Sequence, residues 1–448
     1  MANTYLTRNM TTQGSSIKGT FSCWFKLANS STGFTGGFLG HYFSTSYMFD
    51  ICMQNGHIEV ADYRTSYILR KRTSAIYRDP NAWYHLYVAI DRSLATAGDR
   101  CKIYVNGERV TAFQSSEDQD YSQQTSGGHT GTISMNNDYT ARVGTRYDGN
   151  TFNGVLSHMY WIDGSIIAHT EFGSTDSTTG EWKIETNPTI SSYGTNGFLI
   201  LKDGNTITDQ SGGSYDFASN GAGVTKTEDN PSNVFNTNNP AIVQSANGNH
   251  TYGNTHWATG AASWRMAIGT LGATKGKYYA ECQSYGSGGN VHWMNGIVSL
   301  DQNMAHSNQY PGGDSGKLGA AYNWDGQQYV NGSNSNYGAS YGNNDIIGIA
   351  MDLDNRKLYF SKNGVWQNSG VPTSGSTGTG AIDIPSSTDA YTFGFSAHNS
   401  SMAINFGNGD FAGTSVSSAG TNASGFGIFE YDVPAGYTAL CTKGINSF

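Results

Sequence analysis

The 448-residue sequence is poor in charged residues, in proline and in long hydrophobic runs. Asp, Glu, Lys and Arg make up 13% of the chain, about half of the usual ~25%. No stretch approaches the ~18 consecutive apolar residues of a membrane-spanning helix, and Met1 does not open a charged and then apolar leader. We therefore expect no membrane insertion and no export through a signal peptide.

Positive charge is especially scarce. Lys and Arg number 25 against 34 Asp and Glu, which gives a net charge of -9, and basic residues form a block only at positions 70–72. A nucleic acid would meet repulsion from such a chain rather than release counterions on binding. We expect no nucleic-acid partner.

The five cysteines lack the Cys-x-x-Cys spacing of a zinc or redox site. A thiol inside a hydrophobic strand behaves as a small apolar side chain. We therefore expect free, buried thiols, with a disulfide scaffold or a zinc site as the alternative. These residues are Cys23, Cys52, Cys101, Cys282 and Cys441.

Glycine and aromatic residues are abundant instead. The chain has 58 Gly, many of them beside Ser, Thr and Asn, and aromatic residues make up 13% of it. Short alternating runs lie between these turn-rich clusters, and no long amphipathic helical pattern occurs. The pattern predicts an all-β chain that folds throughout, because aromatic side chains can build its cores.

Two stretches illustrate the pattern. In residues 83–91, period-2 spacing assigns one face to a core, namely Tyr84, Leu86, Val88 and Ile90. The following Asn106-Gly107 predicts a tight hairpin, because this pair accepts the positive φ angles of a primed turn. Residues 346–366 repeat the arrangement, with Asn363-Gly364 as the turn. The repetition predicts two sandwiches of related architecture.

Each half resembles a known family. Residues 19–172 resemble laminin-G and concanavalin-like jelly rolls in five blocks, which are residues 20–25, 83–85, 104–107, 143–144 and 152–156. Residues 277–441 resemble a SPRY domain in four blocks, which are residues 278–281, 325–329, 345–352 and 405–407. The resemblance implies two concanavalin-like/SPRY jelly-roll sandwiches, at 1–173 and 241–448, joined by an ordered bridge at 174–240.

This domain order resembles virion structural proteins of tailed phages, particularly marine ones. The resemblance implies a non-enzymatic protein on the head or tail surface of the virion, acting as a tail-fibre or appendage adhesin. Its expected partners are other virion proteins, a host-surface glycan or protein, and further copies of itself. Two alternatives stay open, a capsid-decorating or tail-assembly protein that makes only virion contacts, and a carbohydrate-active hydrolase.

The sequence contains no coherent catalytic set. The Gly-x-Ser-x-Gly pattern at 338–342 leads into another strand-like run rather than a helix, and the Gly-Asp-Ser-Gly at 313–316 lacks the following residues of a serine protease. Glycosidases need two carboxylates flanking the scissile bond. Glu181 and Glu185 are the nearest candidates, but they fall in the bridge rather than in a sandwich. We expect no catalytic residues.

Tyrosine and tryptophan beside polar residues suit the binding of sugars or proteins. The candidate ligand-binding residues lie in loop-like clusters: Tyr139, Arg142, Tyr147 and Asp148 in the first domain, and Tyr310, Trp324, Tyr329, Tyr337, Tyr341 and His398 in the second. Trp324 fits a core position equally well. No cofactor is expected, although the laminin-G resemblance implies a Ca²⁺ site at a rim, to which Asp138, Asp148 and Asn150 offer oxygen ligands.

Overall fold

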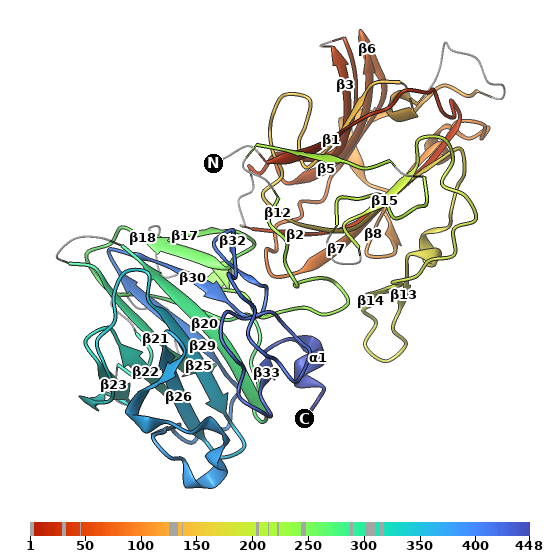
Figure 1. Cartoon of the computed structure of the whole chain (residues 1–448). Coiled ribbons are helices and arrows are strands. Elements are labelled where there is room, and N and C mark those ends of the chain that lie inside the picture. Colours follow the sequence, from red (N-terminus) through yellow and green to blue (C-terminus); the bar gives the residue numbers. More distant parts are fainter. Residues whose placement is uncertain are drawn as a thin grey trace. The chain divides into compact units, whose positions relative to one another are not determined.

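The computed structural model describes residues 4–28, 33–44, 46–124, 133–136, 138–202, 206–213, 215–221, 224–242, 248–286, 290–300, 310–313 and 318–448. It divides into two compact units, Met1–Val224 and Thr225–Phe448. Almost all regular secondary structure in both units is β-strand, which confirms the expected all-β class (Figure 1). Within these residues no helix is both long enough and apolar enough to span a membrane.

The first unit contains an eight-stranded and a six-stranded sheet. In spatial order the eight-stranded sheet is β10 (Phe113–Gln119), β6 (Ser66–Thr73), β5 (His57–Arg64), β4 (Tyr47–Gln54), β3 (Gly36–Ser44), β11 (Thr140–Val143), β1 (Tyr5–Asn9) and β16 (Ala218–Asn220). The six-stranded sheet is β15 (Phe198–Ile200), β12 (Gly154–Asp163), β2 (Lys18–Leu27), β7 (Trp83–Asp91), β8 (Cys101–Val105) and β9 (Glu108–Arg109). A small hairpin joins β13 (Gly173–Thr175) to β14 (Trp182–Ile184).

The inner faces of these two sheets share one hydrophobic core. Alternate residues of β4, such as Phe49 and Ile51, pack in the same cluster as Phe21 and Phe25 of β2. This arrangement is a β-sandwich, in which alternate side chains of each strand face the shared core.

The outer face of the six-stranded sheet is also covered. The sequence assigned one face of β7 to a core, and Tyr87 on its opposite face lies in a second apolar cluster with Phe172 and Leu199. The chain after β12 returns across this face, and β15 pairs with β12 along Phe198–Ile200. Much of the expected bridge therefore forms part of the first sandwich, and the division between the units falls at Val224.

The second unit repeats the two-sheet plan. One sheet contains β17 (Gly248–Thr251), β18 (His256–Thr259), β30 (Ser401–Asn405), β20 (Lys277–Tyr285), β25 (Ile346–Asp352), β26 (Lys357–Lys362) and β27 (Val365–Trp366), with β28 (Ile382–Asp383) paired to β26 and β33 (Thr438–Ala439) paired to β20. The other contains β19 (Arg265–Ile268), β29 (Tyr391–His398), β21 (His292–Ser299), β22 (Gly319–Asn323), β23 (Gln327–Val330) and β24 (Ser333–Asn336).

Short elements complete the two units. Strands β31 (Asp410–Phe411) and β32 (Thr414–Ser415) pair with each other, and α1 (Thr442–Ile445) is a single turn of α-helix near the C-terminus. Turns of 3-10 helix are η1 (Ala97–Asp99), η3 (Ser134–Asn136), η4 (His169–Glu171), η6 (Pro240–Ile242), η7 (Gln367–Ser369) and η8 (Pro372–Thr377).

Two local predictions are confirmed. The hairpins β8–β9 and β26–β27 turn at Asn106-Gly107 and Asn363-Gly364, and all four residues have positive φ between 48° and 80°. Asn and Gly tolerate this left-handed backbone, which a primed turn requires. All five cysteines are free and buried, as the sequence predicted.

Candidate functional site

The outer face of the six-stranded sheet in the second unit carries a cluster of rings. On β21, Trp293 points into the core, so its neighbour His292 points outward. His398 of β29 is the direct register partner of His292, and the two ring centroids lie 5.4 Å apart. Adjacent strands thus place the two imidazoles side by side.

Four further rings surround this histidine pair, and all six side chains are half-buried. The six-ring cluster consists of Trp264, His292, Tyr310, Trp324, Tyr329 and His398. Trp324 stacks on His292 with centroids 4.3 Å apart and an interplanar angle of 14°. Trp264 lies 5.6 Å from Tyr310, which in turn lies 5.6 Å from Tyr329.

Burial and the neighbouring imidazole both lower the pKa of His292. His398 is anchored because its Nδ1 lies 3.0 Å from the carbonyl oxygen of Asn290. The lowered pKa favours neutral His292, which adds an uncharged imidazole to the aromatic rings around it. Such a surface suits the apolar face of a sugar or an aromatic or aliphatic protein side chain.

Two residues expected on this binding surface lie in the core instead. Tyr337 and Tyr341 are 6% and 4% exposed. The Tyr337 hydroxyl accepts a hydrogen bond from the Phe360 amide at 3.2 Å, and the Tyr341 hydroxyl donates to the Tyr322 carbonyl at 2.9 Å. Their loops fold inward because these buried hydroxyls meet backbone partners there, so neither tyrosine is available to a ligand. Trp324 fits both expectations, because it belongs to the half-buried cluster and also packs against the core.

Two of the four residues expected in the first unit, Arg142 and Tyr147, contact Tyr42, and a third, Asp148, follows Tyr147 in its loop. The Arg142 guanidinium lies over the Tyr42 ring, 5.2 Å from its centroid. Tyr147 faces the same ring at 6.5 Å, and Asp148 forms an ion pair of 3.4 Å with Arg146 in the same loop. This group lies on the outer face of the eight-stranded sheet.

Tyr139 lies apart from that group. Its ring stacks on Phe43 with centroids 4.2 Å apart, and Phe43 is 55% exposed. The Tyr47 ring, 43% exposed, approaches Phe43 edge-on at 6.4 Å. These residues form an exposed aromatic group where β3 and β4 meet.

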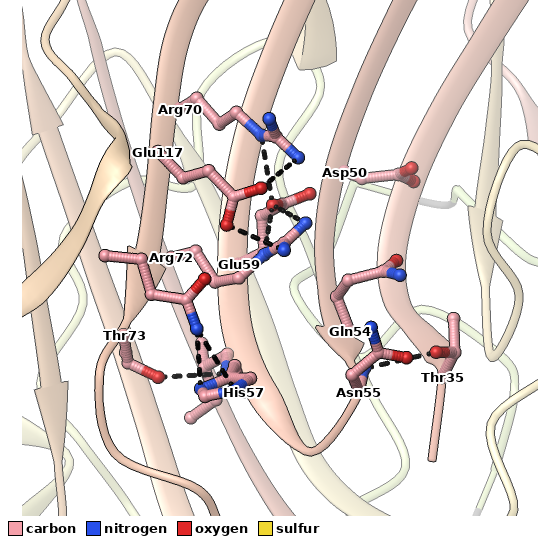
Figure 2. Close-up of polar contacts among 12 residues, drawn as sticks. Thr35, Asp50, Gln54, Asn55, His57, Glu59, Arg70, Arg72, Thr73 and Glu117 are labelled. Atoms are coloured by element: carbon pink, nitrogen blue, oxygen red, sulfur yellow. Dashed lines mark hydrogen bonds and ion pairs between the residues drawn. The ribbon is translucent and has the colours of Figure 1, made fainter. Parts of the chain in front are cut away.

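A closed ring of charges lies further along the same outer face (Figure 2). Glu59 of β5 contacts Arg70 Nε at 3.2 Å and Arg72 Nη2 at 2.7 Å. Glu117 of β10 contacts the same two guanidinium groups at 2.9 and 2.6 Å. The ring joins three neighbouring strands and fastens the edge strand β10 to the sheet.

Asp50 lies on the next strand, outside this ring (Figure 2). Its side chain is 3% exposed, and its nearest cation is Arg146, with Nε 3.7 Å from Oδ2. No hydrogen bond of standard geometry reaches either carboxylate oxygen, although the backbone of Tyr147 approaches the group. Burial is the main cause that raises the pKa of Asp50 to about 8.

The residues considered for Ca²⁺ or catalysis are exposed. Asp148 Oδ1 accepts a hydrogen bond from the Asn150 amide at 3.2 Å, and Asp138 is exposed. The described residues contain no group of three His, Cys, Asp or Glu side chains that could hold a metal ion. Glu181 and Glu185 are exposed on and beside the β13–β14 hairpin.

The structure describes one of the two serine motifs. The pattern at 338–342 lies between β24 and β25, so no helix follows Ser340, whose carbonyl accepts a hydrogen bond from Lys362 Nζ at 2.8 Å. Residues 314–316 lie outside the described residues.

Sequence reasoning missed several members of these sites. The alternation of β21 around Trp293 could have identified His292 as an outward residue. Asp50 could have been identified as a lone acid in the apolar run 48–53. Trp264 and the partners of Glu117 had no comparable local signal, because their contacts depend on strands distant in sequence.

Similar chains are found among known proteins and solved structures. The chain is 32% identical over 151 residues to the ATP-dependent RNA helicase DDX1 of Xenopus laevis, an alignment that covers 33% of this chain and 17% of the helicase. Among solved structures, the SPRY domain of human HERC1 is 13% identical, with a TM-score of 0.27, and covers 34% of this chain and 87% of that one. The TRIM65 PSpry domain is 12% identical, with a TM-score of 0.28, and covers 38% and 91%.

The family model gives the more direct assignment. The model of the SPRY domain matches residues 275–409, which span β20 to β30 and hold all of the six-ring cluster except Trp264. This part of the chain is a SPRY domain.

Proposed function

We propose that this chain is a non-enzymatic structural protein of a tailed-phage virion, a tail-fibre or appendage adhesin that binds a glycan or protein on the host surface. The six-ring cluster, of which all members except Trp264 lie in the SPRY domain, is the observation that carries the proposal. The order of a jelly-roll sandwich followed by a SPRY domain, which resembles virion proteins, supports the setting.

The cluster has the chemistry of a recognition surface. Half-buried aromatic rings supply contact area at a low cost in conformational entropy, because their positions are already fixed by packing. The paired imidazoles add hydrogen-bonding groups that can orient a ligand. The two sheets beneath the cluster hold its members at fixed spacing, so the surface is preorganised.

Adhesion by such a surface gains strength from copy number. Several copies on one particle convert weak binding at each site into strong attachment, since later contacts form at a high effective concentration. We propose a homo-oligomer mounted on the head or tail surface through contacts with other virion proteins.

One experiment separates the proposed adhesin from a capsid-decorating or tail-assembly protein. Purified full-length chain is mixed with intact host cells and, separately, with virions stripped of it, and bound protein is recovered with the particles. An adhesin binds the cells in a saturable way. Binding to stripped virions with none to cells would refute adhesion and favour the decorating role.

A further inference from the structure

Arg142 of β11 lies on the outer face of the eight-stranded sheet, and its neighbour on β3 is a glycine. Strand register places it beside Gly40, and Gly40 lies beside Asp50 on the next strand. A Cβ at Gly40 would lie 2.6 Å from Asp50 Oδ1, so a side chain there would require the Asp50 carboxyl group to move. Arg142 and Asp50 are thus separated by a position without a side chain.

The Arg142 guanidinium has no carboxylate partner among the described residues. The buried Nε of Arg142 makes no hydrogen bond, and the guanidinium lies over the face of the Tyr42 ring. The other arginines of this face are paired. Arg70 and Arg72 contact Glu59 and Glu117, and Arg146 contacts Asp50 and Asp148.

Tyr42 lies against the Arg142 guanidinium, and Tyr147 faces Tyr42 and lies under the Arg146 guanidinium at 5.2 Å. Tyr42 and Tyr147 are both half-buried, with an interplanar angle of 21°. Tyr147 is presented by a tight loop in which the Arg146 amide donates to the Asn150 carbonyl at 3.0 Å. The loop lies directly on β3, because a Cβ at Gly37 would meet the Thr145 carbonyl at 2.3 Å. The rings are therefore held by the backbone beneath them.

The nearby carboxyl groups do not compete for Arg142. Asp50 is separated from Arg142 by Gly40, its nearest cation is Arg146, and burial raises its pKa to about 8. Asp148 is held by Arg146, with 3.4 Å between Oδ2 and Nη1. An incoming carboxylate thus meets a cation whose charge is not already matched within the described residues.

We propose that Arg142, Tyr42 and Tyr147 form a binding site for a carboxylated pyranose, such as a uronic or sialic acid unit of a surface glycan. The guanidinium fork would pair with the ligand carboxylate, and the tyrosine rings would contact the apolar face of the sugar. This inference deepens the proposed function by naming the class of glycan and a site in the first unit, separate from the six-ring cluster.

The test measures binding of full-length protein to small, defined probes. Oligogalacturonate and sialyllactose carry the carboxylate, and maltohexaose and lactose are their neutral counterparts. Isothermal titration calorimetry is run on the wild type, on Arg142→Gln and Arg142→Lys, and on the charge-matched control Arg78→Gln. Arg78 is exposed and lies between β6 and β7, away from the site.

We expect the wild type to bind at least one carboxylated probe and neither neutral one. Arg142→Gln should weaken that binding at least tenfold, and Arg142→Lys should weaken it less because charge remains without the fork. Arg78→Gln should bind as the wild type does. Unchanged thermal unfolding of the variants confirms that they are folded.

Three results would overturn the inference: no binding of either carboxylated probe, equal binding of neutral probes, or equal losses in Arg142→Gln and Arg78→Gln. If the wild type still binds host cells in any of these cases, adhesion stands and only the assignment of the glycan fails. If carboxylated sugars bind but cells do not, the site stands and the adhesin role fails.

Discussion

Replacing Glu281 with glutamine should change how the stability of the second unit depends on pH. Glu281 lies on β20 and is fully buried. Its carboxylate accepts hydrogen bonds from the backbone amides of Glu430 and Tyr431, both at 2.8 Å, and from the side chains of Tyr279 at 3.1 Å and Asn405 at 3.3 Å. These bonds fasten the C-terminal segment to the sheet.

The sign of the pH effect follows from the pKa of Glu281, which burial raises from 4.5 to about 7. A folded-state pKa above the unfolded one means that the folded state holds the proton more tightly. The stabilisation is complete below pH 4.5 and is lost as pH rises through 7. Since each pKa unit corresponds to about 1.4 kcal/mol, the loss between pH 4.5 and 8 is about 3 kcal/mol.

Glutamine cannot ionise, so Glu281→Gln should lack this component. It should also cost stability at low pH, because its NH₂ group cannot accept a hydrogen bond from a backbone amide. The difference in unfolding free energy between wild type and variant should therefore shift by about 3 kcal/mol over the range, in favour of the variant at high pH.

Urea unfolding of the full chain provides the measurement, read by pulsed hydrogen exchange in peptides from β20 so that the second unit is followed by itself. Asp389→Asn, at an exposed position of the same unit, is the control and should keep the wild-type slope. Parallel pH profiles for wild type and Glu281→Gln would refute the reasoning, because Glu281 would then titrate alike in both states.

Three further predictions concern the first unit. Burial lowers the pKa of His85 to about 3, so wild-type stability should fall below pH 6.5 by up to about 1.4 kcal/mol per pH unit, and His85→Gln should lose that slope in urea unfolding. Trp182→Ala should destabilise the unit by about 2 kcal/mol, because the ring packs against Gly107 and its Nε1 donates to His85 at 3.0 Å; an unchanged urea midpoint would contradict this. Glu117→Gln should cost about 1 kcal/mol and speed hydrogen exchange in β10; 1 M NaCl should weaken the wild type more than the variant.

Local signals in the sequence predicted local structure well. The Asn-Gly pairs identified two hairpins, because the required positive φ angles restrict the residues that fit. Alternation in β7 placed Leu86 and Val88 in the core correctly. The same alternation could not show that Tyr87 is buried by the returning chain, since that cover comes from residues around 172 and 199.

The candidate sites were harder to predict for the same reason. The composition of their loops identified Tyr310, Trp324, Tyr329 and His398. Their meeting around His292 depends on the pairing of β21, β22, β23 and β29, and the paired residues His292 and His398 are over a hundred positions apart in the sequence. Composition alone did not separate them from Tyr337 and Tyr341, whose hydroxyls meet buried partners. Whether a loop tyrosine turns inward depends on such partners, which only the fold supplies.

The most direct test of the central proposal is saturation binding of the full-length chain to intact host cells, with the six-ring cluster altered. Tyr329→Ala removes a ring of the cluster, and Tyr252→Ala removes a tyrosine that is 52% exposed elsewhere in the same unit. We predict saturable binding by the wild type and by Tyr252→Ala, and at least tenfold weaker binding by Tyr329→Ala with unchanged thermal unfolding. Equal binding by all three proteins, or no binding by the wild type, would contradict the account.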